Sequence, residues 1–269
     1  KRIELEDYHE DIICKAMRGL GLTKTDMAKR INVNKSEIEA VLNGGSDEKI
    51  VRCMAKELNL DPEKLILSVR KEWNPSAVEI SSLRQFNLPF GNMLVNAYLT
   101  WCTKTRKAWI FDTGSSEEPF VRIIEEERLE VDAIFLTHTH HDHIVCLDDL
   151  KQKTNHPPIF VHKSETFDEC ESIEEGFCRN LGDLSLKALH THGHSIGGLT
   201  YQIAGLGKPV AIVGDAIFAG SMGGGMVSYK NALRTNKEKI MALPDETIIC
   251  PGHGPMTTVG EERENNPFF

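Results

Sequence analysis

The stretch THTHHDHI, residues 137–144, places four imidazoles and one carboxylate in eight positions, directly after the run VDAIFL. Strongly hydrated side chains at the end of a buried strand cost free energy unless they are bonded there. His138 and His140 are two positions apart, so in extended backbone they point to the same side and can share one ion. After the chain turns, Asp142 and His143 can reach a second ion. The stretch therefore predicts a metal-binding loop, and a solvated histidine-rich loop is the alternative.

Three further signals lie downstream, each in a glycine-bearing turn that follows an apolar run. They are His194 in HTHGHS, Asp215 in VGDAIF and His253 in CPGHG. Glycine lets the backbone approach a cluster closely and adopt positive φ. Functional side chains of layered α/β proteins collect at strand ends, where they converge without breaking the core. A solvated loop at residues 137–144 would leave these three signals unexplained.

The bulk composition is typical of a water-soluble globular protein. The 269 residues are 40% hydrophobic and 26% charged, and no run of about eighteen apolar residues is present that could span a bilayer. Residues 1–10 are charged and lack the apolar core of a secretory signal, so we expect a cytoplasmic protein with no membrane partner. The seven cysteines are scattered without a CxxC pair, which indicates reduced thiols.

Two segments with different patterns divide the chain. Residues 1–75 have apolar residues at helical spacing and helix-start signals at Thr23, Asn34 and Asp61, which predict a bundle of four or five short helices. Residues 76–269 alternate β-rich and helical runs, which predicts an α/β domain with layered sheets. The predicted strands are residues 78–86, 94–101, 108–111, 131–136, 159–161, 184–189, 199–203, 209–213 and 247–250. The predicted helices of this domain are residues 120–129, 144–151 and 229–243.

The segment LTKTDMAKRINVNKSEIEAVLNG resembles the helix-turn-helix of the Cro/C1 repressor family, with residues 35–42 as its recognition helix. The resemblance implies DNA as a partner. A DNA reader needs a basic face, because phosphate neutralisation supplies most of its affinity. Residues 1–75 instead carry 14 basic and 14 acidic side chains, and the second helix presents Glu37 and Glu39 beside Lys35. Two interpretations stay open: DNA contact, or a helical module that packs on its neighbour or mediates a homo-oligomer.

The motifs HxHxDH at 138–143, GHS, GD and PGHG follow one another in the order of the metallo-β-lactamase-fold hydrolase superfamily, and the chain resembles that family from about residue 92 onward. The resemblance implies an α/β fold, an αββα sandwich preceded here by the small helix-turn-helix-like bundle. It implies two divalent metal ions, zinc with iron or manganese as alternatives, and a bridging hydroxide as the nucleophile. The first metal would be held by His138, His140 and His194, the second by Asp142, His143 and His253, and Asp215 would bridge them. Asp142 would also orient the nucleophile.

The stretches GDAIFAGSMGG, LPDETIICPGHGP and TTVGEERENNPFF resemble the short bacterial glyoxalase II-like hydrolases. That likeness implies hydrolysis of a small thioester, such as a glutathione thioester, and a substrate contact by Tyr229. Three glycines at 223–225 suggest a mobile lid, a widened pocket or a plain flexible loop.

Other functions stay open beside thioester hydrolysis. A persulfide dioxygenase would bind one iron through His138, His194 and Asp215, although such enzymes carry a GRTDF-like sequence where this chain reads GSMGGGM. Lactone or β-lactam hydrolysis would use the same ligands, because pocket loops decide the substrate. A metabolite-sensing regulator that binds DNA through the helical module is the non-enzymatic alternative.

Overall fold

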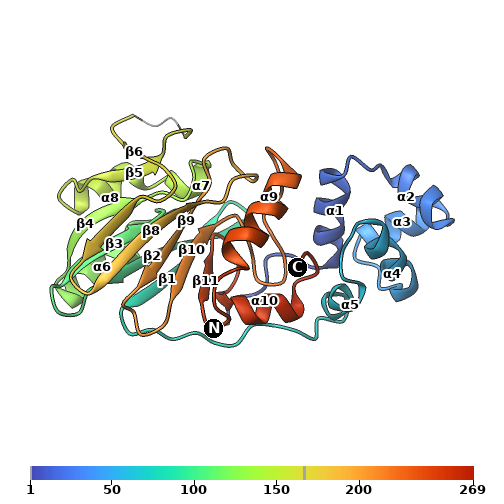
Figure 1. Cartoon of the computed structure of the whole chain (residues 1–269), viewed down its shortest axis with the longest axis horizontal. Helices are drawn as coiled ribbons and strands as arrows, with labels where there is room; N and C mark the ends of the chain where they lie inside the picture. The colour runs from blue at the N-terminus through green and yellow to red at the C-terminus, as the bar shows by residue number, and fades with distance from the viewer. Residues whose placement is uncertain (1, 166–167) are drawn as a thin grey trace.

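The computed structural model describes residues 2–165 and 168–269, and it consists of a helical part followed by a two-layered β-sandwich (Figure 1). The helical module, as we call residues 9–70, contains five helices that lie at one end of the molecule. Their bounds are α1 (His9–Gly19), α2 (Lys24–Ile31), α3 (Lys35–Leu42), α4 (Glu48–Glu57) and α5 (Pro62–Arg70).

Three helices of the module, α2, α4 and α5, begin after residues whose side chains accept hydrogen bonds from free backbone N–H groups. Thr23 Oγ1 accepts a hydrogen bond from the Asp26 N–H, and Asp61 accepts bonds from the first turn of α5. Helices therefore lie at both positions of the predicted helix-turn-helix, α2 and α3. Their functional likeness to repressors stays a prediction.

Two mixed six-stranded sheets face each other in the second part. In spatial order the first contains β1 (Leu83–Phe90), β2 (Met93–Trp101), β3 (Lys107–Phe111), β4 (Glu130–Phe135), β5 (Ile159–His162) and β6 (Glu171–Ile173). The second contains β12 (Thr257–Thr258), β11 (Ile248–Pro251), β10 (Val210–Gly214), β9 (Leu199–Ala204), β8 (Leu184–His190) and β7 (Cys178–Leu181). The remaining helices are α6 (Glu118–Glu127), α7 (His141–Ile144), α8 (Leu147–Lys153), α9 (Tyr229–Thr235), η1 (Asn236–Ile240) and α10 (Val259–Asn265).

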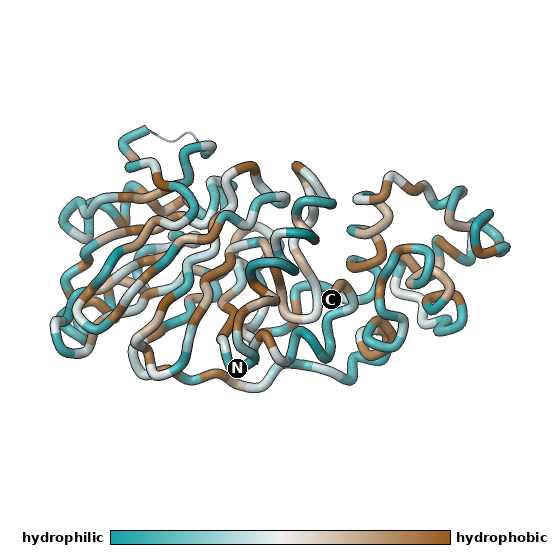
Figure 2. The backbone as a smooth tube through the Cα atoms, viewed as in Figure 1, coloured by the Kyte–Doolittle hydropathy of each residue, from teal (hydrophilic) through white to brown (hydrophobic). Residues whose placement is uncertain are grey.

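The core lies between the sheets, and helices cover both outer faces. Aromatic rings of Phe111, Phe135 and Phe160 stack at centroid distances of 5.5 and 5.1 Å in the inner layer. The tube in Figure 2 shows that apolar segments concentrate in the strands. Because β10 carries helices on one side and the sheet interior on the other, all five of its residues are buried. The predicted α/β sandwich behind a helical bundle is confirmed.

Some element boundaries differ from the prediction. The first strand begins at Leu83 instead of residue 78, and Val78 and Ile80 pack on the core from an irregular segment. The helix predicted at 229–243 is interrupted, since α9 passes into the π-helical turn η1 at Asn236. There the buried Asn236 side chain donates a hydrogen bond to the Ala216 carbonyl. The short elements β6, β7, β12 and α10 lacked a periodic signal long enough to predict them.

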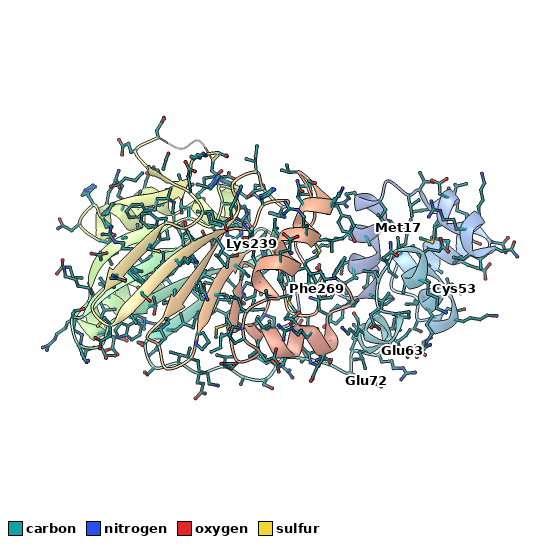
Figure 3. The ribbon with its side chains drawn as sticks, in the orientation of Figure 1. Met17, Cys53, Glu63, Glu72, Lys239 and Phe269 are labelled. Carbon is teal, nitrogen blue, oxygen red and sulfur yellow. The ribbon has the colours of Figure 1, made fainter. Side chains whose placement is uncertain are left out.

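The helical module and the sandwich pack against each other. Met222, Tyr229 and Ala232 from the sandwich side join the apolar cluster of the module. The C-terminal tail lies along α5, where the Asp61 N–H donates to the Pro267 carbonyl at 2.8 Å and Lys64 donates to the Phe269 carbonyl. Phe269 is labelled between the two parts in Figure 3. A division into domains at residue 75 stays a prediction. Within the described residues, every helix is too short or too polar to traverse a bilayer.

Candidate metal centre

Four strands bring the predicted ligands to one edge of the sandwich, beside α7 and α9 (Figure 1), and a fifth strand brings Asp112 there. β3 and β4 are parallel, so Asp112 after β3 and the stretch 137–143 after β4 emerge at the same edge. β10 and β11 are also parallel and deliver Asp215 and His253. β8 points the same way, because β9 is antiparallel to both β8 and β10, and it leads to His194.

The first cluster contains His138, His140, His194 and Asp215. His140 Nδ1 lies 3.0 Å from Nε2 of His138 and 3.0 Å from Nε2 of His194. Asp215 Oδ2 is 3.3 Å from His194 Nε2 and 4.0 Å from His138 Nε2. The four ligand atoms lie within 4.8 Å of one another, which is a spacing that one ion can fill.

The second cluster contains Asp142, His143 and His253. Asp142 Oδ2 lies 3.5 Å from His143 Nε2 and 3.3 Å from His253 Nε2. Asp215 reaches this cluster too, since its Oδ1 is 3.3 Å from His143 Nε2 and its Oδ2 is 3.5 Å from His253 Nε2. One carboxylate therefore touches both clusters.

Hydrogen bonds behind the clusters fix which nitrogen faces the centre in four of the five rings, whereas His140 turns its Nδ1 toward His138 and His194. His138 Nδ1 lies 3.0 Å from Thr137 Oγ1, and His143 Nδ1 lies 3.0 Å from Asp112 Oδ2. The Nδ1 atoms of the other two rings lie against backbone carbonyls, His194 at 2.8 Å from Gly224 and His253 at 2.6 Å from Leu94. Rings anchored through Nδ1 present Nε2 to the centre, as metal-binding histidines do.

Burial and neighbouring charges divide the imidazoles into two kinds. Burial lowers the pKa of His138 and of His194, so both are neutral and offer a lone pair. Burial is the largest single effect on His143 and His253 and opposes their protonation, but the carboxylates around them together outweigh it. Asp215 with Asp112 raises the pKa of His143 to about 10, and Asp215 with Asp142 raises that of His253 to about 11. The pKa of Asp215 is lowered despite its burial, because His143 and His253 face it. Divalent cations neutralise such carboxylates in place of protons.

Two polar atoms at the centre lack a partner. His143 Nε2 and Asp215 Oδ1 are buried and make no hydrogen bond within the described residues. A buried polar atom without a partner costs about 1–3 kcal/mol, which bonding to a cation removes. Imidazole nitrogens and carboxylate oxygens suit zinc, iron and manganese alike. The side chains present therefore fit a pair of divalent cations.

The backbone approaches the centre where only glycine fits. A Cβ atom on Gly252 would lie 2.1 Å from Asp215 Oδ1 and 2.8 Å from His143 Cε1. Any larger residue would displace the bridging carboxylate. The first glycine of the PGHG motif, Gly252, is thus required by the close approach of the backbone to the centre.

A model of the Metallo-beta-lactamase superfamily matches residues 91–169 and 171–253, which include both clusters. The chain belongs to this superfamily. Together with the clustered histidine and aspartate side chains, this membership identifies it by homology as a metallo-hydrolase. The helical module lies outside the matched residues.

Named relatives and a solved structure each align with about two thirds of the chain. "Probable metallo-hydrolase YqgX" of Bacillus subtilis is 31% identical over 208 residues, covering 68% of this chain and 95% of the relative. "Hydroxyacylglutathione hydrolase GloC" of Haemophilus influenzae is 28% identical over 202 residues, covering 65% and 92%. The structure of TTHA1623 in a di-iron-bound form aligns with a TM-score of 0.56 and 27% identity, covering 68% of this chain and all of that one.

Tyr229 begins α9 and packs with the apolar cluster of the helical module. Its ring is 8% exposed and packs against α1, where a Cβ on Gly19 would lie 2.2 Å from the ring. Burial raises the pKa of its hydroxyl to about 12. The structure shows a packing role for this residue, and the predicted substrate contact stays a prediction.

The three other histidines of these motifs lie outside both clusters. His141 is exposed and faces Phe90 at a ring distance of 5.8 Å. His190 stacks on His162 at 4.1 Å and on His192 at 4.4 Å. Their exclusion from the predicted ligand set stays a prediction.

Sequence reasoning assigned no role to Asp112, whose carboxylate supports the candidate ligands on the side away from the centre. Its carboxylate accepts hydrogen bonds from the Thr137 N–H at 2.7 Å and the Thr137 hydroxyl at 2.8 Å, and it contacts His143. Its backbone has a φ of 54°, which is strained for a residue with a side chain. The signal was available in the sequence, since Asp112 directly follows a predicted strand as Asp215 does.

The helical module also contacts the centre indirectly. Lys15 of α1 pairs with Asp7 and donates a hydrogen bond at 2.9 Å to the Met222 carbonyl. Asp7 in turn accepts a bond at 2.6 Å from Ser221 Oγ. The Lys15 ammonium lies 4.8 Å from the ring of Phe218, which packs edge-on against His253. The module thus holds the segment that follows Asp215.

Proposed function

We propose that the chain hydrolyses a small thioester with the help of two divalent cations. The observation that carries the proposal is Asp215, whose two oxygens contact histidines of both clusters at 3.3–4.0 Å. Thioester as the substrate is supported by the similarity to a relative named hydroxyacylglutathione hydrolase. Zinc, iron and manganese all suit the nitrogen and oxygen donors.

The cations would be held by His138, His140 and His194 on one side, by Asp142, His143 and His253 on the other, and by Asp215 between them. Such cations would lower the pKa of a bound water molecule to about 7 and would polarise the scissile carbonyl. The protein's side chains position these partners. The Asp142 carboxylate is half-buried and faces both His143 and His253, and these contacts lower its pKa despite the opposing effect of burial. It is therefore ionised and able to orient the attacking water by accepting a hydrogen bond.

The test compares two reactions on one preparation of the full chain. Metal content is measured first, then cleavage of S-lactoylglutathione and oxygen uptake on glutathione persulfide. We expect two metals per chain and thioester cleavage without oxygen uptake. One iron per chain with oxygen consumption would replace the hydrolase proposal with the persulfide dioxygenase alternative.

The role of Tyr229 has a separate test. Tyr229→Phe keeps the ring packed on Gly19 and removes only the hydroxyl. A raised KM at unchanged melting temperature would support the substrate contact. An unchanged KM would leave the residue with packing alone.

DNA binding by the module is the remaining alternative, and the structure offers little cationic surface for it on α3. Lys24 and Lys35 both lie near the Glu39 carboxylate, at 3.6 and 3.8 Å. A gel-shift assay with genomic fragments at low salt decides the question, because phosphate contacts are strongest there. Absence of a shift would end the regulator interpretation.

A further inference from the structure

The exposed large apolar side chains of the sandwich lie on chain segments that carry or contact the candidate metal ligands. Among the described residues of the sandwich, such side chains with high exposure are Met93, Leu94, Val145, Ile196, Met226 and Val227. Met226 is 63% exposed, Val227 57% and Ile196 56%. Single exposed apolar residues are ordinary on a protein surface, but a group of them beside one site indicates binding. We call these six residues the apolar rim.

Each member of the rim is close to a predicted ligand, either in sequence or through a hydrogen bond of a nearby backbone group. The Leu94 carbonyl lies 2.6 Å from His253 Nδ1, and Met93 precedes it at the start of β2. Val145 follows His143 by two residues, and Ile196 follows His194 by two.

Met226 and Val227 belong to the segment that holds His194. The Val227 N–H donates to the Gly193 carbonyl at 3.0 Å, and the Gly224 carbonyl lies 2.8 Å from His194 Nδ1. A Cβ on Gly223 would lie 1.8 Å from the Asp215 carbonyl oxygen, so this glycine serves close packing. The segment leading into α9 is therefore fixed against the centre, and its outer end is apolar in Figure 2.

The loops that form the centre carry no lysine or arginine. This holds for residues 90–95, 137–146, 191–198, 215–228 and 251–256. The cation that reaches the last loops from the module, Lys15, is already paired with Asp7. A substrate arm with carboxylates, such as the glutathione tripeptide, finds no cationic partner on these loops. An apolar group of a substrate can instead contact the apolar rim.

From this placement we propose that the apolar rim is the acyl subsite of the centre, and that the preferred substrates are thioesters with an apolar acyl chain of several carbons. The inference rests on the proposed thioester hydrolysis and specifies its substrate class. In the reaction the oxygen of water bonds to the acyl carbon and the C–S bond breaks. The products are a carboxylic acid and a thiol, and the water supplies the proton of the thiol.

The experiment measures kcat/KM for N-acetylcysteamine thioesters with unbranched acyl chains from acetyl to octanoyl, on the metal-loaded full chain. Each added CH₂ that enters an apolar site contributes about 0.8 kcal/mol, which corresponds to roughly a fourfold rise. We expect kcat/KM to rise with chain length and to exceed that for S-lactoylglutathione. A flat or falling series, or a preference for S-lactoylglutathione, would overturn the inference while leaving hydrolysis intact.

Variants of the rim test the assignment of residues. The double variant Met226→Ser, Val227→Ser should lower the ratio of octanoyl to acetyl kcat/KM by about tenfold or more, because two apolar contacts are lost. Its matched control, Met226→Leu with Val227→Ile, keeps the apolar surface and should keep the ratio. Melting temperatures verify that both variants fold. An equal ratio in the two variants would contradict the proposal.

Binding of the product gives a readout that does not depend on turnover. Calorimetry should show octanoate binding the metal-loaded protein more tightly than acetate, with the difference reduced in the serine variant. Equal binding of both acids would overturn the subsite, even in a protein that cleaves no thioester. Sedimentation identifies the competing occupant: a dimer that the serine variant dissociates would make the rim an interface between copies of the chain.

Discussion

The helical module and the metal centre hold their charged groups in opposite ways. In the module, Glu48 accepts hydrogen bonds from Arg52 at 2.9 Å and from Arg70 at 2.6 Å, and these bonds lower its pKa to about 2. All three side chains are partly exposed, so water already solvates them and the pairs add little stability. At the centre, His143 is fully buried and Asp215 is 8% exposed. Keeping charged groups buried costs free energy. Buried groups with shifted pKa values are typical of functional sites.

The largest effect should come from changing the buried side chains themselves. Asp215→Ala and His194→Ala should each lower turnover by at least about a thousandfold, or ~4 kcal/mol, because each holds a cation. His141→Ala should have a mild effect, since this histidine lies outside both clusters. Steady-state kinetics with circular dichroism as a folding control measure this. Equal losses in all three variants would refute the division of histidines into ligands and bystanders.

A smaller effect should follow from the carboxylate behind the ligands. Asp112→Asn keeps the shape of the side chain but removes the negative charge that faces His143 and accepts from Thr137. Partners of this kind typically contribute about 10–100-fold in metal affinity or activity. Competition with a chelator measures the affinity. Retention of metal at the parental level would show that the hydrogen bonds behind the ligands are dispensable.

The next effect, on turnover, comes from a contact between the helical module and the metal centre. Lys15→Met removes the donor that the module gives to the Met222 carbonyl and leaves Asp7 with Ser221 alone. We expect roughly a fivefold loss of turnover, or ~1 kcal/mol, because the segment after Asp215 loses a support without losing a ligand. Lys35→Met, at an exposed lysine of α3, is the control and should change nothing. Identical kinetics in both variants would mean that the module does not influence the centre.

The last effect is on stability and not on turnover. It comes from a buried carboxylate that has hydrogen-bond donors around it but no imidazoles. Glu262 accepts bonds from Gly220, Thr257 and Asn266, and burial raises its pKa to about 7 from 4.5. The folded state therefore binds the proton more tightly. Stability from this group is complete below pH 4.5 and is lost as the pH rises through about 7.

Glu262→Gln removes this titration, so the variant should lose less stability than the parent across that range. The difference should be about 3 kcal/mol between pH 4.5 and pH 7, measured by urea unfolding at a series of pH values. Glu264→Gln, on the exposed side of the same helix, is the control. Parallel pH curves for the parent and the Glu262 variant would contradict the assignment.

The sequence by itself determined the helices of the module and most strands of the sandwich, and it predicted the seven candidate ligands that the structure gathers in two clusters. Helix starts such as Thr23 and strands such as β10 depend on neighbours a few positions apart, and local patterns record these. These candidate ligands could be predicted because His138, His194 and Asp215 each follow an apolar run, where a polar or charged group is costly unless it is bonded.

Only the tertiary structure decided how that centre is supported and what surrounds it. Lys15 and Met222 are 207 positions apart, and His253 and Leu94 are 159 apart, so no local pattern records either contact. The burial of Tyr229 against Gly19 likewise depends on how the module docks. Local patterns report which side chains are out of place in a buried strand end, whereas long-range packing alone determines which distant groups meet them there.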